Sequence, residues 1–273
     1  MALTNRTQRI LVAIISIPVL IFLTYIGDIP FLLLSICIGV FAFFEFSKMI
    51  VGKNIYANLP IGILSVTAIM INTYTAITDF SVIVFASVIL LLITELFRNN
   101  GSAINNLGAS LLGIFYIGLF ASSLVGLREF FKYSEILYTE AGYLIISIFA
   151  SIWVCDSAAY FIGSAIGKHK LFPRVSPKKS WEGAIAGFVF AVVTLIAARE
   201  LFLDILSLTD TLIIGIIIGL FGQVGDLVES LVKRDAGVKD SSSIIPGHGG
   251  IFDRFDSILF SVPMVYLYFY FFI

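Results

Sequence analysis

TLIIGIIIGLFGQVGDLVESLVKR, residues 211–234, begins as an apolar run and ends as a series of charged side chains. About 20 residues of α-helix, at 1.5 Å each, cross the hydrocarbon core of a bilayer, so residues 211–232 are long enough to span it. A helix pairs all its backbone groups internally, as a water-free environment requires. The stretch therefore predicts a transmembrane helix that carries charges near one end.

The rest of the chain has the same apolar character. Of its 273 residues, 59% are hydrophobic and 13% are charged, with a mean hydropathy of +1.03, whereas soluble domains carry about 25% charged residues. Apolar runs near spanning length occupy residues 10–27, 30–50, 57–76, 80–97, 104–126, 141–163, 181–203, 211–232 and 256–273. We therefore expect an all-α, polytopic integral membrane protein with about nine transmembrane helices.

Two further features agree with a membrane protein that keeps its first span. The apolar stretch that follows the basic N-terminal flank is too long for a signal-peptide core and has no evident cleavage site. Both cysteines, Cys37 and Cys155, lie inside apolar runs. Their position indicates small buried side chains and argues against a disulfide framework or a thiolate metal site.

The basic residues predict the orientation of the spans. When the nine runs alternate in direction, only Arg128, Lys132 and Arg199 of the 17 lysines and arginines fall on one side of the membrane. The positive-inside rule then places the N-terminus and the richly basic side in the cytoplasm. We expect a multi-pass protein of the cell (plasma or inner) membrane, and the lack of a targeting extension favours a bacterial one.

The charged residues are concentrated in the second half of the chain. Residues 226–256 hold ten of its charged side chains, and a second polar segment covers 156–182. We expect residues 1–140, spans 1 to 5, to have a structural or dimerisation role. Residues 141–273, spans 6 to 9, form the expected catalytic part, with cytoplasmic loops at 164–181 and 233–256. One outgoing and one returning span separate these loops, so they can meet at one cytoplasmic site.

The end of the eighth run carries a polar stripe. Asp226, Glu229, Ser230 and Lys233 follow one another at i, i+3, i+4 and i+7, which places them on one helix face. A charged group facing lipid costs several kcal/mol, so this face is expected to point into the protein or a wet cavity. For Lys233 alone, a lysine that reaches to the membrane interface is an alternative.

The loop PGHGGIFDRFD, residues 246–256, has the composition of a phosphate and metal site. Asp253 and Asp256 lie three residues apart, and adjacent glycines let backbone N–H groups approach an anion closely. Together with Asp226 they form a predicted Mg²⁺ platform, because Mg²⁺ uses one or two carboxylates when substrate phosphates complete its shell. Three roles stay open for His248: phosphate binding, proton abstraction or a hydrogen bond to a backbone carbonyl.

The segment SPKKSWEG, residues 176–183, supplies positive charge. Lys178 and Lys179 precede a helix whose N-terminus opens at Ser180, so charge and helix dipole together predict an anion site. Lys168 and Lys170 have the plainer alternative of holding the topology or touching lipid headgroups. We expect Asp156 to face a polar interior. The roles of Glu45 and Glu95, near cytoplasmic ends of spans, stay open, and an interfacial position explains both.

A longer pattern resembles a known family. The matching positions are Ser230, Lys233-Arg234, Lys239-Asp240, Ser242, Ile245-Pro246, His248-Gly249-Gly250, Asp253-Arg254 and Asp256. This run is similar to the signature of the phosphatidate cytidylyltransferases, also called CDP-diacylglycerol synthases. The segment SPKKSWEG resembles the family as well. The similarity is strong over residues 150–273, and the first 140 residues match in hydropathy alone.

The resemblance implies a reaction in which CTP and phosphatidate give CDP-diacylglycerol and pyrophosphate. It implies Mg²⁺ on Asp226, Asp253 and Asp256, in a centre that takes a second cation. Two further implied catalytic residues are Lys233, which neutralises phosphate charge, and His248, which shapes the phosphate loop with the adjacent glycines. The residues implied to bind substrate are Lys178, Lys179, Ser180, Ser230, Arg234, Lys239, Asp240, Gly249, Gly250 and Arg254. A homodimer in the lipid bilayer, with no nucleic acid as partner, is also implied.

Two other functions compete with this one. A CTP-dependent lipid kinase, such as a polyprenol kinase, moves the γ-phosphate of CTP instead of its cytidylyl group. A transporter lines a path with charges at the membrane midplane, whereas the charges here gather at one face and no inverted repeat is visible.

Overall fold

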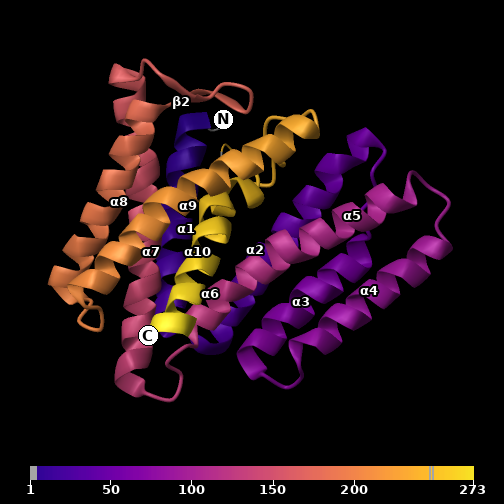
Figure 1. The fold of residues 1–273 in the computed structure, drawn as a ribbon, viewed down its shortest axis with the longest axis horizontal. Coiled ribbons are helices and arrows are strands. Elements are labelled where there is room, and N and C mark those ends of the chain that lie inside the picture. The colour runs from indigo at the N-terminus through magenta and orange to yellow at the C-terminus, as the bar shows by residue number, and fades with distance from the viewer. Residues whose placement is uncertain (1–4, 246, 248) are drawn as a thin grey trace. The chain divides into compact units, whose positions relative to one another are not determined.

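The computed structural model describes residues 5–245, 247 and 249–273 (Figure 1). Over these residues the chain is mostly helical, which confirms the all-α prediction. The α-helices are α1 (Asn5–Ile26), α2 (Asp28–Met49), α3 (Leu59–Thr75), α4 (Phe80–Leu96), α5 (Ala103–Gly113), α6 (Phe120–Arg128), α7 (Glu135–Ile166), α8 (Trp181–Phe202), α9 (Leu208–Asp235) and α10 (Phe252–Phe272). The other elements are a 3-10 turn η1 (Ile50–Lys53), a π-helical turn η2 (Ile114–Leu119) and strands β1 (Lys170–Phe172) and β2 (Ser176–Ser180).

The helices follow the predicted apolar runs. Within the part of the chain that the structure describes, six helical segments are long and apolar enough to cross a membrane: Asp28–Lys53, Ala103–Arg128, Glu135–Ile166, Trp181–Phe202, Leu208–Asp235 and Phe252–Phe272. The turn η2 joins α5 and α6 into one of these. Shorter apolar helices cover Ile10–Ile26, Leu59–Thr75 and Phe80–Leu96. The protein is thus a multi-pass membrane protein, and the count of nine spans stays a prediction.

The described chain divides into two compact units. The first contains Met1–Gly126 and Lys233–Phe255, and the second contains Leu127–Val232 and Asp256–Ile273. Neither unit is a single stretch of sequence, because the loop after α9 groups with the N-terminal helices. The predicted division at residue 140 gives the N-terminal part a structural or dimerisation role and the C-terminal part the catalytic role, and both roles stay predictions.

The core of the first unit is packed around α2. Phe43 and Phe46 are buried, and Gly62 of α3 and Gly113 of α5 both lie against the Phe43 ring. A side chain at either glycine would displace that ring. These contacts hold α2 beside α3 and α5 through a close approach of helix backbones.

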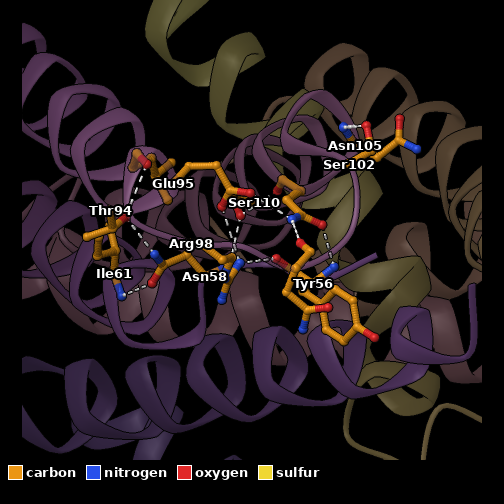
Figure 2. A network of polar contacts seen from close by, with 12 residues as sticks. Tyr56, Asn58, Ile61, Thr94, Glu95, Arg98, Ser102, Asn105 and Ser110 are labelled. Atoms are coloured by element: carbon orange, nitrogen blue, oxygen red, sulfur yellow. Dashed lines mark hydrogen bonds and ion pairs between the residues drawn. The ribbon is translucent and has the colours of Figure 1, made fainter. Parts of the chain in front are cut away.

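A polar network ties the loops of the first unit together (Figure 2). Asn106 Nδ2 donates to Glu95 Oε1 at 2.7 Å, and its Oδ1 accepts from Tyr56 N at 2.7 Å. Asn58 uses its Nδ2 to bond Thr94 Oγ1 at 2.8 Å and its Oδ1 to cap α3 at Ile61 N. The buried carboxylate of Glu95 therefore joins the end of α4 to α5, which gives it a structural role in the loops.

The second unit is built on α7 and α8, which run side by side (Figure 1). A Cβ on Gly163 would lie 3.3 Å from the Cα of Gly183, so the two helices approach at their glycines. Helix α9 packs on α8 in the same way, with Gly215 against Val192 and Gly219 against Phe188. The hairpin β1–β2 connects α7 to α8, inside the segment expected as a cytoplasmic loop.

Candidate functional site

Three carboxylates of the second unit converge. Asp226 and Glu229 lie one turn apart on α9, Asp256 comes from α10, and one oxygen of each lies within 4.8 Å of the others. Oxygen ligands at this spacing suit a hard divalent cation such as Mg²⁺. Among the described residues, these three form a group able to hold a metal ion.

A glycine brings the two helices together at this point. A Cβ on Gly225 would lie 2.7 Å from the backbone oxygen of Asp256 and 2.7 Å from Cβ of Phe260. Because any larger residue would push α10 away from α9, Gly225 sets the distance between Asp226 and Asp256. The Asp256 side chain is oriented by a 2.6 Å hydrogen bond from Ser257 N to its Oδ1.

The cluster lies in surroundings that favour a bound cation. Glu229 is fully buried, and Asp226 and Asp256 are half-buried. Negative charges this close repel each other, and the repulsion grows as solvent is excluded. A positively charged side chain already lies beside the cluster, because Lys179 Nζ is 2.6 Å from Asp226 Oδ2. Ser230 Oγ adds a 3.3 Å hydrogen bond to Asp226 Oδ1.

The hairpin determines where Lys179 lies. Strands β1 and β2 are antiparallel, with Lys170 paired to Ser180. His169 Nδ1 lies 2.6 Å from Glu182 Oε1, and Trp181 N donates to His169 O at 2.9 Å, which closes the hairpin onto α8. Lys178 and Lys179 are thereby held at the start of α8, where the helix dipole attracts anions.

Ser180 has a local partner in this arrangement. It is buried and is the N-cap of α8, with its Oγ accepting a 3.2 Å hydrogen bond from Gly183 N. The structure thus gives Ser180 a capping role. Its predicted contact with the triphosphate stays a prediction.

A second polar region lies in the first unit and surrounds Asp253. Lys233 Nζ lies 2.7 Å from Asp253 Oδ1. The other oxygen, Oδ2, accepts from Ser241 N at 3.0 Å, Ser241 Oγ at 2.9 Å and Gly250 N at 2.8 Å. Asp253 therefore binds the loop after α9 to the first turn of α10. Its predicted role as a metal ligand stays a prediction.

Other predicted residues of this loop lie at the surface. Arg234, Lys239, Asp240 and Arg254 are exposed, and Arg234 Nη1 donates to Val238 O at 3.0 Å. Gly249 has a φ of +86°, a conformation that favours glycine, and its carbonyl accepts from Ile245 N. The residue His248 lies outside the described residues.

Sequence reasoning left Glu45 without a role. The structure places its carboxylate, 1% exposed, among Ser241, Ser242 and the first backbone amides of α10. An acidic residue inside an apolar run was the available signal, since a carboxylate there needs a polar partner. The identity of that partner required the tertiary structure.

Comparison with known proteins decides the family. The sequence profile of the cytidylyltransferase family matches residues 7–272. The chain belongs to the cytidylyltransferase family. It is 35% identical to the phosphatidate cytidylyltransferase of Bacillus subtilis over 97% of both chains. It is 33% identical to that of Brucella suis over 97% of this chain and 94% of the relative.

Similarity to a third relative is local and higher. The phosphatidate cytidylyltransferase of Haemophilus influenzae is 44% identical over 142 residues, which is 48% of this chain and 46% of that protein. Membership of the cytidylyltransferase family makes the chain a nucleotidyltransferase. The carboxylate cluster and the neighbouring lysine have the chemistry that such an enzyme needs to handle nucleotide phosphates.

Proposed function

We propose that this protein transfers the cytidylyl group of CTP to phosphatidate and forms CDP-diacylglycerol and pyrophosphate. The observation that carries the proposal is the group Asp226, Glu229 and Asp256, beside Lys179, in a membrane chain of the cytidylyltransferase family. Relatives that align over nearly the full chain are named for this activity. A membrane enzyme suits this reaction because one substrate is a lipid and the other is a soluble nucleotide.

The chemistry requires no nucleophile from the protein. An oxygen of the phosphatidate phosphate attacks the α-phosphorus of CTP, and the bond from that phosphorus to the bridging oxygen of the β-phosphate breaks. Pyrophosphate leaves with the bonding electrons. Because the attacking phosphate is already anionic at neutral pH, catalysis consists of alignment and charge neutralisation.

The carboxylate cluster fits a divalent cation. Asp226, Glu229 and Asp256 would hold Mg²⁺, which when bound neutralises phosphate charge. The sequence prediction named Asp253 where this set has Glu229. The contacts of Asp253 support the set with Glu229, because the Asp253 carboxylate already accepts hydrogen bonds from Ser241 and Gly250 and pairs with Lys233. A second cation remains part of the proposal.

The basic residues would hold the phosphates. Lys178, Lys179 and the N-terminus of α8 offer positive charge beside the carboxylates. The predicted substrate contacts of Ser230, in the second unit, and of residues in the 233–256 segment belong to the same proposal, and the latter are Lys233, Arg234, Lys239, Asp240, His248, Gly249, Gly250 and Arg254. The proposal also includes a site that faces the cytoplasm, a location in a bacterial plasma membrane and a homodimer.

A pair of labelled nucleotides tests the function. Purified protein in detergent, with Mg²⁺ and phosphatidate, is incubated in parallel with α-labelled and γ-labelled CTP. We expect label to enter lipid from α-labelled CTP and the γ-label to leave in pyrophosphate. Lipid labelled only from γ-labelled CTP would make the protein a kinase. No lipid labelling by folded protein from either nucleotide would contradict both enzyme functions.

A further inference from the structure

Glu45 is a buried carboxylate far in sequence from the polar loops. It lies in α2, one turn before the helix ends at Met49, and is 1% exposed. A buried carboxylate is tolerated when several donors replace its hydration. The hydrogen-bond donors around Glu45 therefore identify the part of the chain that its carboxylate holds.

Four donors meet the two oxygens of Glu45. Oε1 accepts from Ser242 Oγ at 2.6 Å and from Ile251 N at 3.0 Å. Oε2 accepts from Ser241 Oγ at 3.0 Å and from Phe252 N at 2.8 Å. All four belong to the segment 241–252, so one side chain of α2 holds both ends of that segment.

The two backbone donors are the start of α10. The first N–H groups of a helix have no partner within the helix and are normally capped by a nearby polar side chain. Ile251, which precedes α10, has an apolar side chain and cannot cap it. Glu45 supplies the missing acceptor from another helix, and its charge is favourable at the positive end of the α10 dipole.

Ser241 connects Glu45 to Asp253. Its Oγ lies 3.0 Å from Glu45 Oε2 and 2.9 Å from Asp253 Oδ2 and shares its single proton between the two carboxylates, while its backbone N–H donates to Asp253. Asp253 in turn pairs with Lys233. Gly250 has no room for a side chain because a Cβ there would collide with Ser241 Oγ and Glu45 Oε2. A shift of Glu45 is therefore transmitted to Asp253 and Lys233.

We infer that Glu45 is a positioning residue for the transfer reaction: it holds segment 241–252 so that Asp253 and Lys233 keep their places. The inference rests on the proposed function, in which this loop handles the phosphates. Glu45 acts through its hydrogen bonds to the loop, and this role requires that both of its carboxylate oxygens accept hydrogen bonds. An amide nitrogen cannot accept a hydrogen bond, so Glu45→Gln leaves one of the two backbone N–H groups of Ile251 and Phe252 unbonded.

The test compares Glu45→Gln with Glu95→Gln in the full-length protein in detergent. Glu95 is the matched control because it is also a buried carboxylate of the first unit, but it bonds Asn106 and pairs with Arg98. We expect Glu45→Gln to lower kcat about 10- to 100-fold, with a smaller change in the KM for CTP. Glu95→Gln is expected to lower the thermal midpoint while kcat stays near the wild-type value.

Hydrogen exchange gives a readout that is independent of activity. In Glu45→Gln, the amides of Ile251 and Phe252 should exchange about tenfold faster than in the wild type, while Glu95→Gln leaves them unchanged. Unchanged exchange in Glu45→Gln would overturn the anchoring. Faster exchange with normal kcat, or an equal loss of kcat in Glu95→Gln, would overturn the positioning role. If the wild type transfers no cytidylyl group, the proposed function fails, and the exchange data still report on the anchor.

Discussion

Lys179 Nζ and Asp226 Oδ2 lie 2.6 Å apart and join strand β2 to helix α9. The pair connects the two polar segments of the second unit, one basic and one acidic. Both side chains are about a third exposed, so water reaches the pair and screens it. The lysine therefore lies where it can contact an anion, and the aspartate where it can contact a cation.

Asp226 should be indispensable for transfer. We expect Asp226→Asn to reduce kcat at least about 100-fold, because the variant loses a charged ligand in a site that works by charge neutralisation. A label-transfer assay with α-labelled CTP measures the effect. Glu200→Gln, an exposed carboxylate paired with Arg199 in the same unit, serves as the control and should remain active. Comparable activity of the two variants would remove Asp226 from the mechanism.

Metal affinity separates Glu229 from Asp253. Binding of Mn²⁺ to the purified protein, followed by electron paramagnetic resonance, should weaken about 10- to 100-fold in Glu229→Gln. Asp253→Asn is expected to keep its Mn²⁺ affinity and yet to lose transfer activity, because Lys233 and Ser241 lose their partner. The reverse pattern of affinities would restore Asp253 to the metal site and remove Glu229.

Lys179 and Lys178 should differ although they are adjacent. Lys179 pairs with Asp226, whereas Lys178 is exposed. We expect Lys179→Gln to lower kcat/KM for CTP about 10- to 100-fold more than Lys178→Gln, because one charge-assisted contact is worth about 1.5–3 kcal/mol. Steady-state kinetics at varied CTP measures both. Equal effects would show that the hairpin contributes only general positive charge.

Gly250 should not tolerate a methyl group. In Gly250→Ala the new Cβ would collide with Ser241 Oγ and Glu45 Oε2, and relief of the overlap should cost about 1–3 kcal/mol. A lower thermal midpoint together with lost activity is the expected result. Gly52→Ala is the matched control because a Cβ there meets nothing within 4 Å. A stable, active Gly250→Ala protein would contradict the close packing of this loop.

Much of the fold follows from the sequence because a bilayer imposes simple requirements. Apolar runs near spanning length must be helical, and each predicted run corresponds to described helix. The residue types also led to the prediction of a metal site at Asp226 and Asp256 and of an anion site at Lys179. Hydropathy does not tell how the helices are rotated and shifted against one another, however, so it leaves open which polar residues face one another.

By itself, the sequence determined that this is a helical membrane protein of the cytidylyltransferase family whose acidic and basic residues gather in two polar segments. Only the tertiary structure decided the partners. It grouped Glu229 with Asp226 and Asp256, bound Asp253 to Lys233, and connected Glu45 to the start of α10. The physical reason is that the partners of a buried charge are set by the packing of distant helices. Glycines such as Gly225 control that packing through the space they leave, and this space is visible only in the folded chain.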